Sequence, residues 1–232
     1  MIKDAVDIQK FDAIGDIHGC YYELIRLVED MGYEKNTEGL YIHSDDRKLV
    51  FLGDITDRGW FNSMSFQFVM KHWEAGLALW CRGNHDQKLF KWLMGHPVRV
   101  ADGLAGTVRE FEQGWPFDRE REELGAYLRD NVPTKIKLDG GDVIAVHAYH
   151  DSDSFKDHIY GPRSGQDNSR VEWWPEYKGP PYVLFGHYWL NDPEPKNWYC
   201  CLDTSCCKSG HLSALRWPQM EVVQVEAQAG YY

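Results

Sequence analysis

The segment Gly53-Asp54-Ile55-Thr56-Asp57-Arg58-Gly59 constrains the fold and chemistry of this chain more than any other stretch. It follows the apolar residues 49–52, a run typical of a buried β-strand. Glycines at both ends permit tight backbone turns. A carboxylate at a strand end can hold a metal ion, and the guanidinium of Arg58 can bind a phosphate. The alternative is a polar loop with a structural Asp–Arg pair.

Two other segments place similar residues after apolar runs. Gly15-Asp16-Ile17-His18-Gly19 follows residues 11–14, and Gly83-Asn84-His85-Asp86 follows residues 77–81. Alternating strands and helices predict a mostly parallel sheet with helices packed on it. Ligands bind beyond the carboxyl ends of such strands, so the three polar loops are expected to share one edge. The spacing of apolar residues predicts helices over residues 21–31 and 63–74, and a third helix that runs to Gly95.

The second half of the chain is less regular, but it shows no linker, so we expect one domain over residues 1–232. Residues 96–132 have patchy helical spacing and are interpreted as a helical insertion. Residues 151–181 are polar and rich in Gly, Pro and Trp, which favours a long functional loop near the active site. A hairpin is expected over residues 136–138 and 143–146, and further strands over residues 182–185, 202–204, 212–217 and 222–225.

Composition limits the partners of the chain. The formal net charge of −11 disfavours the binding of extended nucleic acids, whose phosphates attract Lys and Arg. We identify neither a signal peptide nor an apolar stretch long enough to span a membrane, and therefore expect a cytoplasmic protein with no membrane partner. The six cysteines are accordingly interpreted as reduced thiols.

The polar residues at the predicted strand ends form a set of candidate metal ligands. Their oxygen and nitrogen donors suit Mn²⁺, Fe²⁺ or Zn²⁺ better than Ca²⁺ or Mg²⁺. Six ligands are too many for one catalytic zinc ion, but they suit two ions that share one carboxylate. The set consists of Asp16, His18, Asp54, Asn84, His147 and His187.

The three segments together match the pattern GDxHG…GDxxDRG…GNH[ED]. The chain therefore resembles the PPP-type, calcineurin-like metallophosphoesterases, over residues 11–226. Within that family it is most similar to small bacterial members: diadenosine tetraphosphatases, Ser/Thr protein phosphatases and the phosphatase domain of polynucleotide kinase-phosphatase. The resemblance implies an α/β fold of two packed mixed β-sheets flanked by α-helices, in four layers α/β/β/α.

The resemblance also implies two divalent metal ions, with Mn²⁺ preferred and Fe or Zn as alternatives. Asp54 would bridge both ions. Asp16 and His18 would complete the first site. The remaining ligands would hold the second ion, namely Asn84, His147 and His187.

In the same family pattern, Arg58 and Asn84 would bind the substrate phosphate. His85 would be the general acid, and Asp57 would orient it. A metal-bound hydroxide would attack phosphorus, while His85 protonates the leaving oxygen. A carboxylate beside a histidine favours the charged imidazolium, which supports this role.

Several residues keep two interpretations. Many family members have His-Ala-Gly where this chain has His147-Ala148-Tyr149-His150, so His150 is a competing ligand, although His147 directly ends a strand. Asp203 either orients the metal histidines or only ends a strand. Arg170 either reaches the substrate from the long loop or is simply solvated.

The paired cysteines also allow two interpretations. Cys200-Cys201 and Cys206-Cys207, with His211, could form a structural zinc site. However, adjacent cysteines do not match a C-x₂₋₄-C knuckle, and neighbouring residues of a strand point to opposite faces. Small buried residues in a pair of strands are the alternative that we favour.

The expected function is hydrolysis of phosphate esters or anhydrides. We favour a small substrate such as a dinucleoside polyphosphate, because Trp173, Trp174 and Tyr149 could form a wall on which a base stacks. The alternative for these rings is that they only pack the long loop onto the body of the protein. The alternatives are a phosphoprotein phosphatase and a nucleotide phosphodiesterase. An inactive phosphate-binding module is disfavoured, because the motif lacks no metal ligand.

Overall fold

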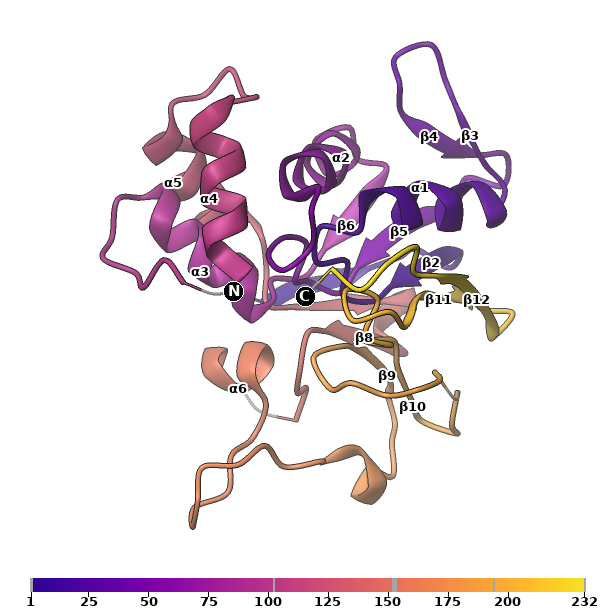
Figure 1. Ribbon diagram of the computed structural model, residues 1–232. Helices are drawn as coiled ribbons and strands as arrows, with labels where there is room; N and C mark the ends of the chain where they lie inside the picture. Colours follow the sequence, from indigo (N-terminus) through magenta and orange to yellow (C-terminus); the bar gives the residue numbers. More distant parts are fainter. Residues whose placement is uncertain (1, 102, 152–153, 194, 232) are drawn as a thin grey trace.

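The computed structural model of the chain describes residues 2–101, 103–151, 154–193 and 195–231. Two five-stranded sheets pack face to face in these parts of the chain (Figure 1). The first has the strand order β12-β11-β2-β5-β6, in which β2, β5 and β6 are parallel and β11 and β12 antiparallel. Its strands are β2 (Phe11–Ile14), β5 (Lys48–Phe51), β6 (Ala78–Trp80), β11 (His211–Trp217) and β12 (Glu221–Glu226).

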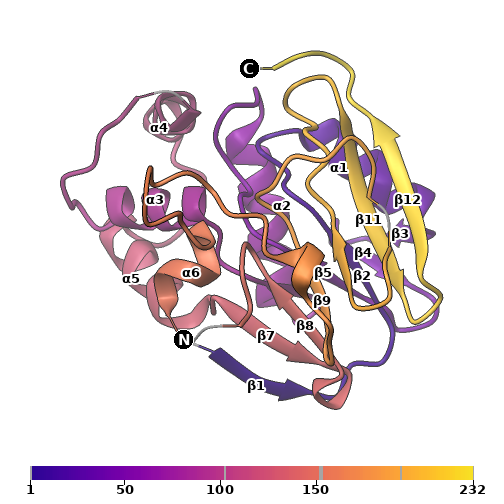
Figure 2. The same ribbon diagram turned by 90° about the horizontal axis from the view of Figure 1, so that it is seen from below.

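The second sheet is also mixed, with the order β1-β7-β8-β9-β10. The expected hairpin is its antiparallel pair β7–β8, which lies between β1 and β9 (Figure 2). The β8–β9 and β9–β10 pairs are parallel. Its strands are β1 (Ile2–Val6), β7 (Lys135–Leu138), β8 (Val143–Val146), β9 (Tyr182–Phe185) and β10 (Tyr199–Cys201). The predicted class of two packed mixed sheets with helices is confirmed.

An apolar layer joins the two sheets. Phe11, Val50 and Leu79 of the first sheet meet Ile136 and Leu184 of the second, and all five are buried. Strands β5, β6 and β9 are apolar on both faces, because one face meets the other sheet and the opposite face meets a covering layer.

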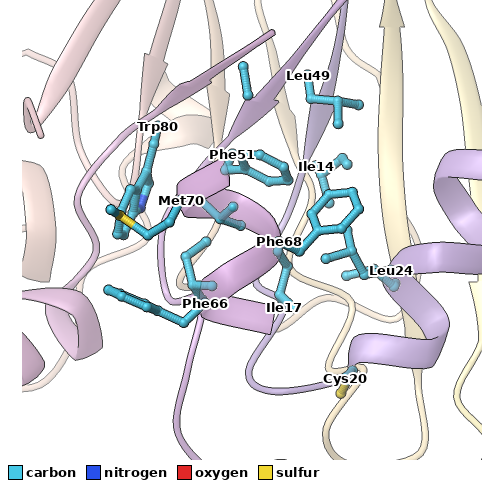
Figure 3. Close-up of a cluster of buried hydrophobic side chains, with 14 of the residues drawn as sticks. Ile14, Ile17, Cys20, Leu24, Leu49, Phe51, Phe66, Phe68, Met70 and Trp80 are labelled. Atoms are coloured by element: carbon cyan, nitrogen blue, oxygen red, sulfur yellow. The ribbon is translucent and has the colours of Figure 1, made fainter. Parts of the chain in front are cut away.

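Helices α1 (Tyr21–Asp30) and α2 (Asn62–Glu74) cover the outer face of the first sheet. Leu24 of α1 and Phe66 of α2 share a cluster with Ile14, Phe51 and Trp80 of the strands (Figure 3). Burial of such large side chains stabilises the fold by about 1.5–3 kcal/mol each. The predicted bounds of both helices are right to within one residue.

Three further helices lie together at one side of the sheets (Figures 1 and 2). The third predicted helix is α3, and residues 96–132 contain α4 and α5, which both contact α3. The three helices pack on the buried cluster of the first sheet, to which they contribute Leu93, Leu104 and Leu128. The bounds are α3 (Asn84–Leu93), α4 (Gly103–Gln113) and α5 (Arg121–Asn131).

The outer face of the second sheet is covered mainly by residues 154–177. This segment contains the short helix α6 (Phe155–Tyr160) and a 3₁₀ turn, Trp174–Glu176, so the long loop predicted for residues 151–181 is only partly irregular. Residues 152 and 153 lie outside the described parts. Trp173 and Trp174 are 9% and 6% exposed and pack on Phe185 of β9. The expectation that they form a wall for a base is therefore wrong.

Other differences concern strands. The first strand of the chain, β1, pairs with the distant β7, and β3 (Tyr33–Lys35) with β4 (Tyr41–His43) forms a separate ribbon. The sequence predicted none of the three strands β1, β3 and β4. Residues 202–204 were expected as a strand but follow β10 as irregular chain, because Asp203 and its neighbours turn toward the polar edge. Among the described residues, the structure has no helix of the length and apolarity needed to cross a membrane.

Candidate active site

The predicted ligands lie after the carboxyl ends of five strands from both sheets. Asp16 and His18 follow β2, Asp54 follows β5, and Asn84 follows β6. His147 follows β8 directly, and His187 comes two residues after β9. All of these except Asn84 are buried, with at most 4% exposure.

Asp54 lies at the centre of this group. Its Oδ2 atom is 3.6 Å from Nε2 of His18 and 3.5 Å from Nε2 of His147. Its Oδ1 atom accepts a hydrogen bond from the backbone N–H of His85, at 2.8 Å. Burial alone would raise the pKa of Asp54, but the surrounding histidines, His147 first, lower it below its ordinary value. Asp54 is thus a charged carboxylate that two imidazoles face.

Backbone carbonyls fix the orientation of these two imidazoles. Nδ1 of His18 lies 2.9 Å from the carbonyl oxygen of Thr56, and Nδ1 of His147 lies 2.8 Å from that of Leu52. A carbonyl only accepts, so each Nδ1 carries a proton and each Nε2 faces Asp54. Such a second hydrogen bond is typical of histidines that ligate metals.

A second carboxylate group lies beside His187. Both Oδ atoms of Asp16 accept from the backbone N–H of His187, at 3.2 and 3.3 Å. Burial raises the pKa of Asp16, and the nearby Asp203 and Asp54 raise it further. Burial also raises the pKa of Asp203 to about 6. Three buried acids close together are costly unless cations compensate them.

The donor set fits two divalent cations. Two groups of three side chains could each hold a metal ion, His18–Asp54–His85 and Asp54–His147–His187, and Asp54 belongs to both. Within each group the ligand atoms lie within 4.8 Å of one another; the first group contains His85, the predicted acid, and not the predicted ligand Asp16. Nδ1 of His187 lies 3.2 Å from Nε2 of His147 and so faces the second group, while its Nε2 is buried without a hydrogen-bond partner among the described residues. Asn84 adds an amide oxygen 3.1 Å from Nε2 of His147.

His85 has a different set of contacts from the other histidines. Its Nδ1 atom lies 2.6 Å from Oδ2 of Asp57, and its Nε2 atom lies 3.0 Å from the guanidinium of Arg58. The hydroxyl of Thr107 donates to Oδ1 of Asp57 at 2.6 Å, and the backbone N–H of Asp57 donates to that hydroxyl. Thr107 belongs to α4, so residues 96–132 support the site directly. No sequence motif marked this residue.

Arg58 lies between two histidines. One guanidinium nitrogen is 2.7 Å from Nε2 of His18, and the other reaches His85. The guanidinium of Arg58 therefore lies between His18, a predicted metal ligand, and His85, the predicted general acid, where a phosphate could contact it.

The backbone at this edge adopts conformations that suit glycine and cost other residues about 1–3 kcal/mol each. A Cβ atom on Gly83 would lie 2.2 Å from Oδ1 of Asp54, so only glycine fits there. Asp86, which sequence reasoning left without a role, accepts backbone N–H groups of Asp54 and Gly83 and holds the two loops together. Positive φ angles occur at five polar site residues, namely His18 (47°), Asp54 (52°), Asp57 (76°), Arg58 (71°) and His187 (67°).

The residues with two interpretations are now placed. His150 packs its ring on Tyr177, at 4.6 Å between centroids, and His147 alone of the two joins a ligand group. Arg170 donates to the backbone carbonyl of His187, at 3.0 Å. The carboxylate of Asp203 accepts from the N–H of Ser205 and lies near Asp16.

The cysteine pairs do not assemble with His211 into a ligand group within the described residues. Cys200 lies in the layer between the sheets and Cys201 on the outer face, as adjacent strand residues should. Cys206 instead lies beside Cys20 and Glu23, all buried; Oε1 of Glu23 accepts from the hydroxyl of Tyr231.

This geometry agrees with the comparisons with known proteins. The family model for calcineurin-like phosphoesterases matches residues 9–213. The chain belongs to this family. A calcineurin-like phosphoesterase is a metal-dependent hydrolase of phosphate bonds, and that chemistry fits the two ligand groups around Asp54.

Relatives of this calcineurin-like phosphoesterase are similar over nearly their whole length. The bis(5'-nucleosyl)-tetraphosphatase PrpE [asymmetrical] of Bacillus velezensis is 34% identical, over 95% of this chain and 94% of its own. The protein of that name from Bacillus subtilis is 33% identical, over 95% and 96%.

Solved structures agree on the fold. A crystal structure assigned as a diadenosine tetraphosphatase has a TM-score of 0.70 and 22% identity, and covers 99% of both chains. A cold-active protein tyrosine phosphatase has a TM-score of 0.57 and 18% identity, over 99% of this chain and 81% of its own.

Proposed function

We propose that this enzyme hydrolyses dinucleoside tetraphosphates, with two metal ions bound around Asp54. The observation that carries the proposal is the similarity to bis(5'-nucleosyl)-tetraphosphatases, at 33–35% identity over nearly the whole chain. Similarity that extends through the loops as well as the core supports a shared substrate class more strongly than a shared fold does.

The residues around Asp54 are assigned as ligands on their donor atoms. Asp16 and His18 would hold one ion, and Asp54 would bridge both. Asn84, His147 and His187 would hold the other. When bound, two divalent ions supply an activated water and neutralise charge on the phosphoryl group. The mixed oxygen and nitrogen donors favour Mn²⁺, with Fe or Zn as alternatives.

His85 is proposed as the general acid. Its Nδ1 atom donates to the carboxylate of Asp57 at 2.6 Å, which fixes the orientation of the ring. In this structure Nε2 of His85 accepts from the guanidinium of Arg58 at 3.0 Å, so the proton to be given away would occupy Nε2 once Arg58 turns to a bound phosphate. A proton held there can pass to the leaving phosphate or alkoxide oxygen, which lowers the cost of bond cleavage.

Arg58 and Asn84 are proposed to bind the phosphate under attack. Arg58 already lies within hydrogen-bond distance of His18 and His85, so a phosphate bound to its guanidinium would lie beside both groups. Arg170 donates to the carbonyl of His187, which supports a positioning role in place of direct substrate contact. Asp203 lies close to Asp16 and is proposed to raise the pKa of that carboxyl group. A cytoplasmic location remains a prediction.

A substrate panel tests the proposal. We expect Mn²⁺-loaded enzyme to have a kcat/KM for diadenosine tetraphosphate at least about ten-fold above that for a phosphoserine or phosphothreonine peptide, or for bis-p-nitrophenyl phosphate. Preference for the peptide would support a phosphoprotein phosphatase, and preference for the diester a phosphodiesterase. Either result would overturn the proposed substrate and retain the phosphoesterase chemistry.

A further inference from the structure

We propose that Trp189 and Lys208 form a subsite for the nucleotide portion of the substrate beyond the phosphate bound at Arg58. The inference rests on the proposed function and names residues that complete its recognition. Trp189 is two residues after His187, on the segment that leaves the carboxyl end of β9. Its ring is 44% exposed, although tryptophan is usually largely buried.

Two cations lie beside this ring. Nζ of Lys208 is 3.5 Å from the ring centroid, and the guanidinium carbon of Arg58 is 5.5 Å from it. Cation–π attraction holds an aromatic ring in place without burying it. Trp189 therefore connects the phosphate-binding Arg58 to a second positive charge farther along the surface.

Backbone hydrogen bonds fix the two segments that carry these side chains relative to the site. Leu190, which follows Trp189, donates its N–H to the carbonyl of Asp203, at 3.0 Å. The backbone N–H of Lys208 donates to the carbonyl of Ser205, at 2.8 Å, in the turn that follows Asp203. Ring and ammonium group thus extend from the two segments that also carry His187 and Asp203.

The chemistry of the pair selects an anionic ligand with a flat aromatic group. A dinucleoside tetraphosphate has phosphates on both sides of the cleaved bond and a base at each end. With one phosphate at Arg58, the ammonium group of Lys208 can move from the ring of Trp189 to a neighbouring phosphate, and a base can stack on the ring face that it leaves. In an acidic chain of net charge −11, such a local pair of cations is what attracts a polyanion.

The buried tryptophans cannot take this role. Trp173 and Trp174 are packed against Phe185 and lie within the core of the second sheet. Trp198 is 39% exposed but directly precedes β10, at the amino end of a strand parallel to β9. It is therefore at the edge opposite the site and provides a matched control.

The test uses Mn²⁺-loaded full-length enzyme with diadenosine tetraphosphate and with inorganic tetrapolyphosphate, which has no base. Because a stacked base would be lost, Trp189→Ala should lower kcat/KM for the dinucleotide about ten-fold, mainly through KM. The loss on tetrapolyphosphate should be several-fold smaller, and Trp189→Phe should recover most of the lost affinity. Trp198→Ala should behave as wild type on both substrates.

Lys208→Met tests the phosphate contact separately. It should raise KM for both substrates and weaken the dependence of KM on salt. Equal losses on both substrates in Trp189→Ala, or no loss on either, would overturn the subsite while the enzyme still hydrolyses the dinucleotide. A loss confined to a phosphopeptide would make Trp189 a peptide contact and overturn it too. Wild-type enzyme inactive on the dinucleotide would overturn both this inference and the proposed function.

Discussion

Oδ2 of Asp57 lies 2.6 Å from Nδ1 of His85, while Oδ1 of the same carboxylate accepts the hydroxyl of Thr107. The two oxygens of one buried acid thus join the loop after β5 to α3 on one side and to α4 on the other. This arrangement fixes the ring of His85 with Nε2 toward Arg58.

His85→Asn should remove the proposed general acid. General acid catalysis contributes about 10²–10⁴-fold, so kcat should fall by that factor for substrates with poor leaving groups. The loss should be much smaller for activated aryl phosphates, whose leaving oxygens need no proton. A plot of log kcat against leaving-group pKa for wild type and variant measures this, and parallel lines would exclude the role.

Thr107→Val should weaken the support of Asp57 without touching the substrate. We expect kcat to fall about ten-fold, because small misplacements of a catalytic group are costly. Thr107→Ser, which keeps the hydroxyl, should retain most of the activity. In a His85→Asn background the same substitution should have little further effect, because both changes disable one unit. Full additivity of the two losses would show that Thr107 acts elsewhere.

Asp12 provides a prediction for stability. Its buried carboxylate accepts from Arg47, Arg216 and the hydroxyl of Tyr33, and so joins β2 to β11 and to the β3–β4 ribbon. Asp12→Ala leaves the buried guanidinium of Arg47 uncompensated, and should lower the free energy of unfolding by about 3–5 kcal/mol. Asp130→Ala, at the exposed pair with Arg129, should have little effect in the same urea titration. Similar losses at both positions would contradict this account.

His72 should make stability depend on pH. Its Nε2 accepts from the backbone N–H of Tyr41 and its Nδ1 donates to the carbonyl of Phe68, so the buried ring is neutral. Burial lowers the pKa of His72 below its ordinary value of about 6.5. Below that pH the unfolded state binds a proton that the folded ring resists, so stability falls with decreasing pH until the folded pKa is reached.

The measurement is the free energy of unfolding between about pH 7.5 and pH 5. His72→Leu should lower stability at neutral pH and flatten the decline toward acid, because it removes one linked proton. His96→Gln, at an exposed histidine, should leave the slope as in wild type. An unchanged slope in His72→Leu would show that His72 does not contribute to the decline.

Local patterns made much of the fold predictable. The helices that end before Gly32 and Gly76 follow from apolar spacing and from glycines with φ of +85° and +71°, which terminate a helix at low cost. The candidate metal ligands could be selected because each lies shortly after the end of an apolar strand, and their role stays a prediction. By contrast, β1 pairs with a strand about 130 residues away, and such pairing has no local signal.

The surroundings of the site were harder to predict. Trp173 and Trp189 are the same residue type in segments of similar polarity, yet one fills the core and the other lies exposed beside Arg58. Only tertiary packing decides between these outcomes. Thr107 likewise lies 50 residues from Asp57 in the chain, in a helix that no motif connects to the site.

The central claim is that Asp54 is shared by two metal ions that the reaction requires. The most direct measurement is metal content and turnover of the wild type and of Asp54→Asn, after removal of metal and titration with Mn²⁺. We expect wild-type activity to rise from nil to a plateau at about two ions per chain. Asp54→Asn should bind fewer than two ions and remain inactive, with wild-type circular dichroism. Turnover of metal-free protein, or a folded Asp54→Asn variant with both ions and full activity, would contradict the account.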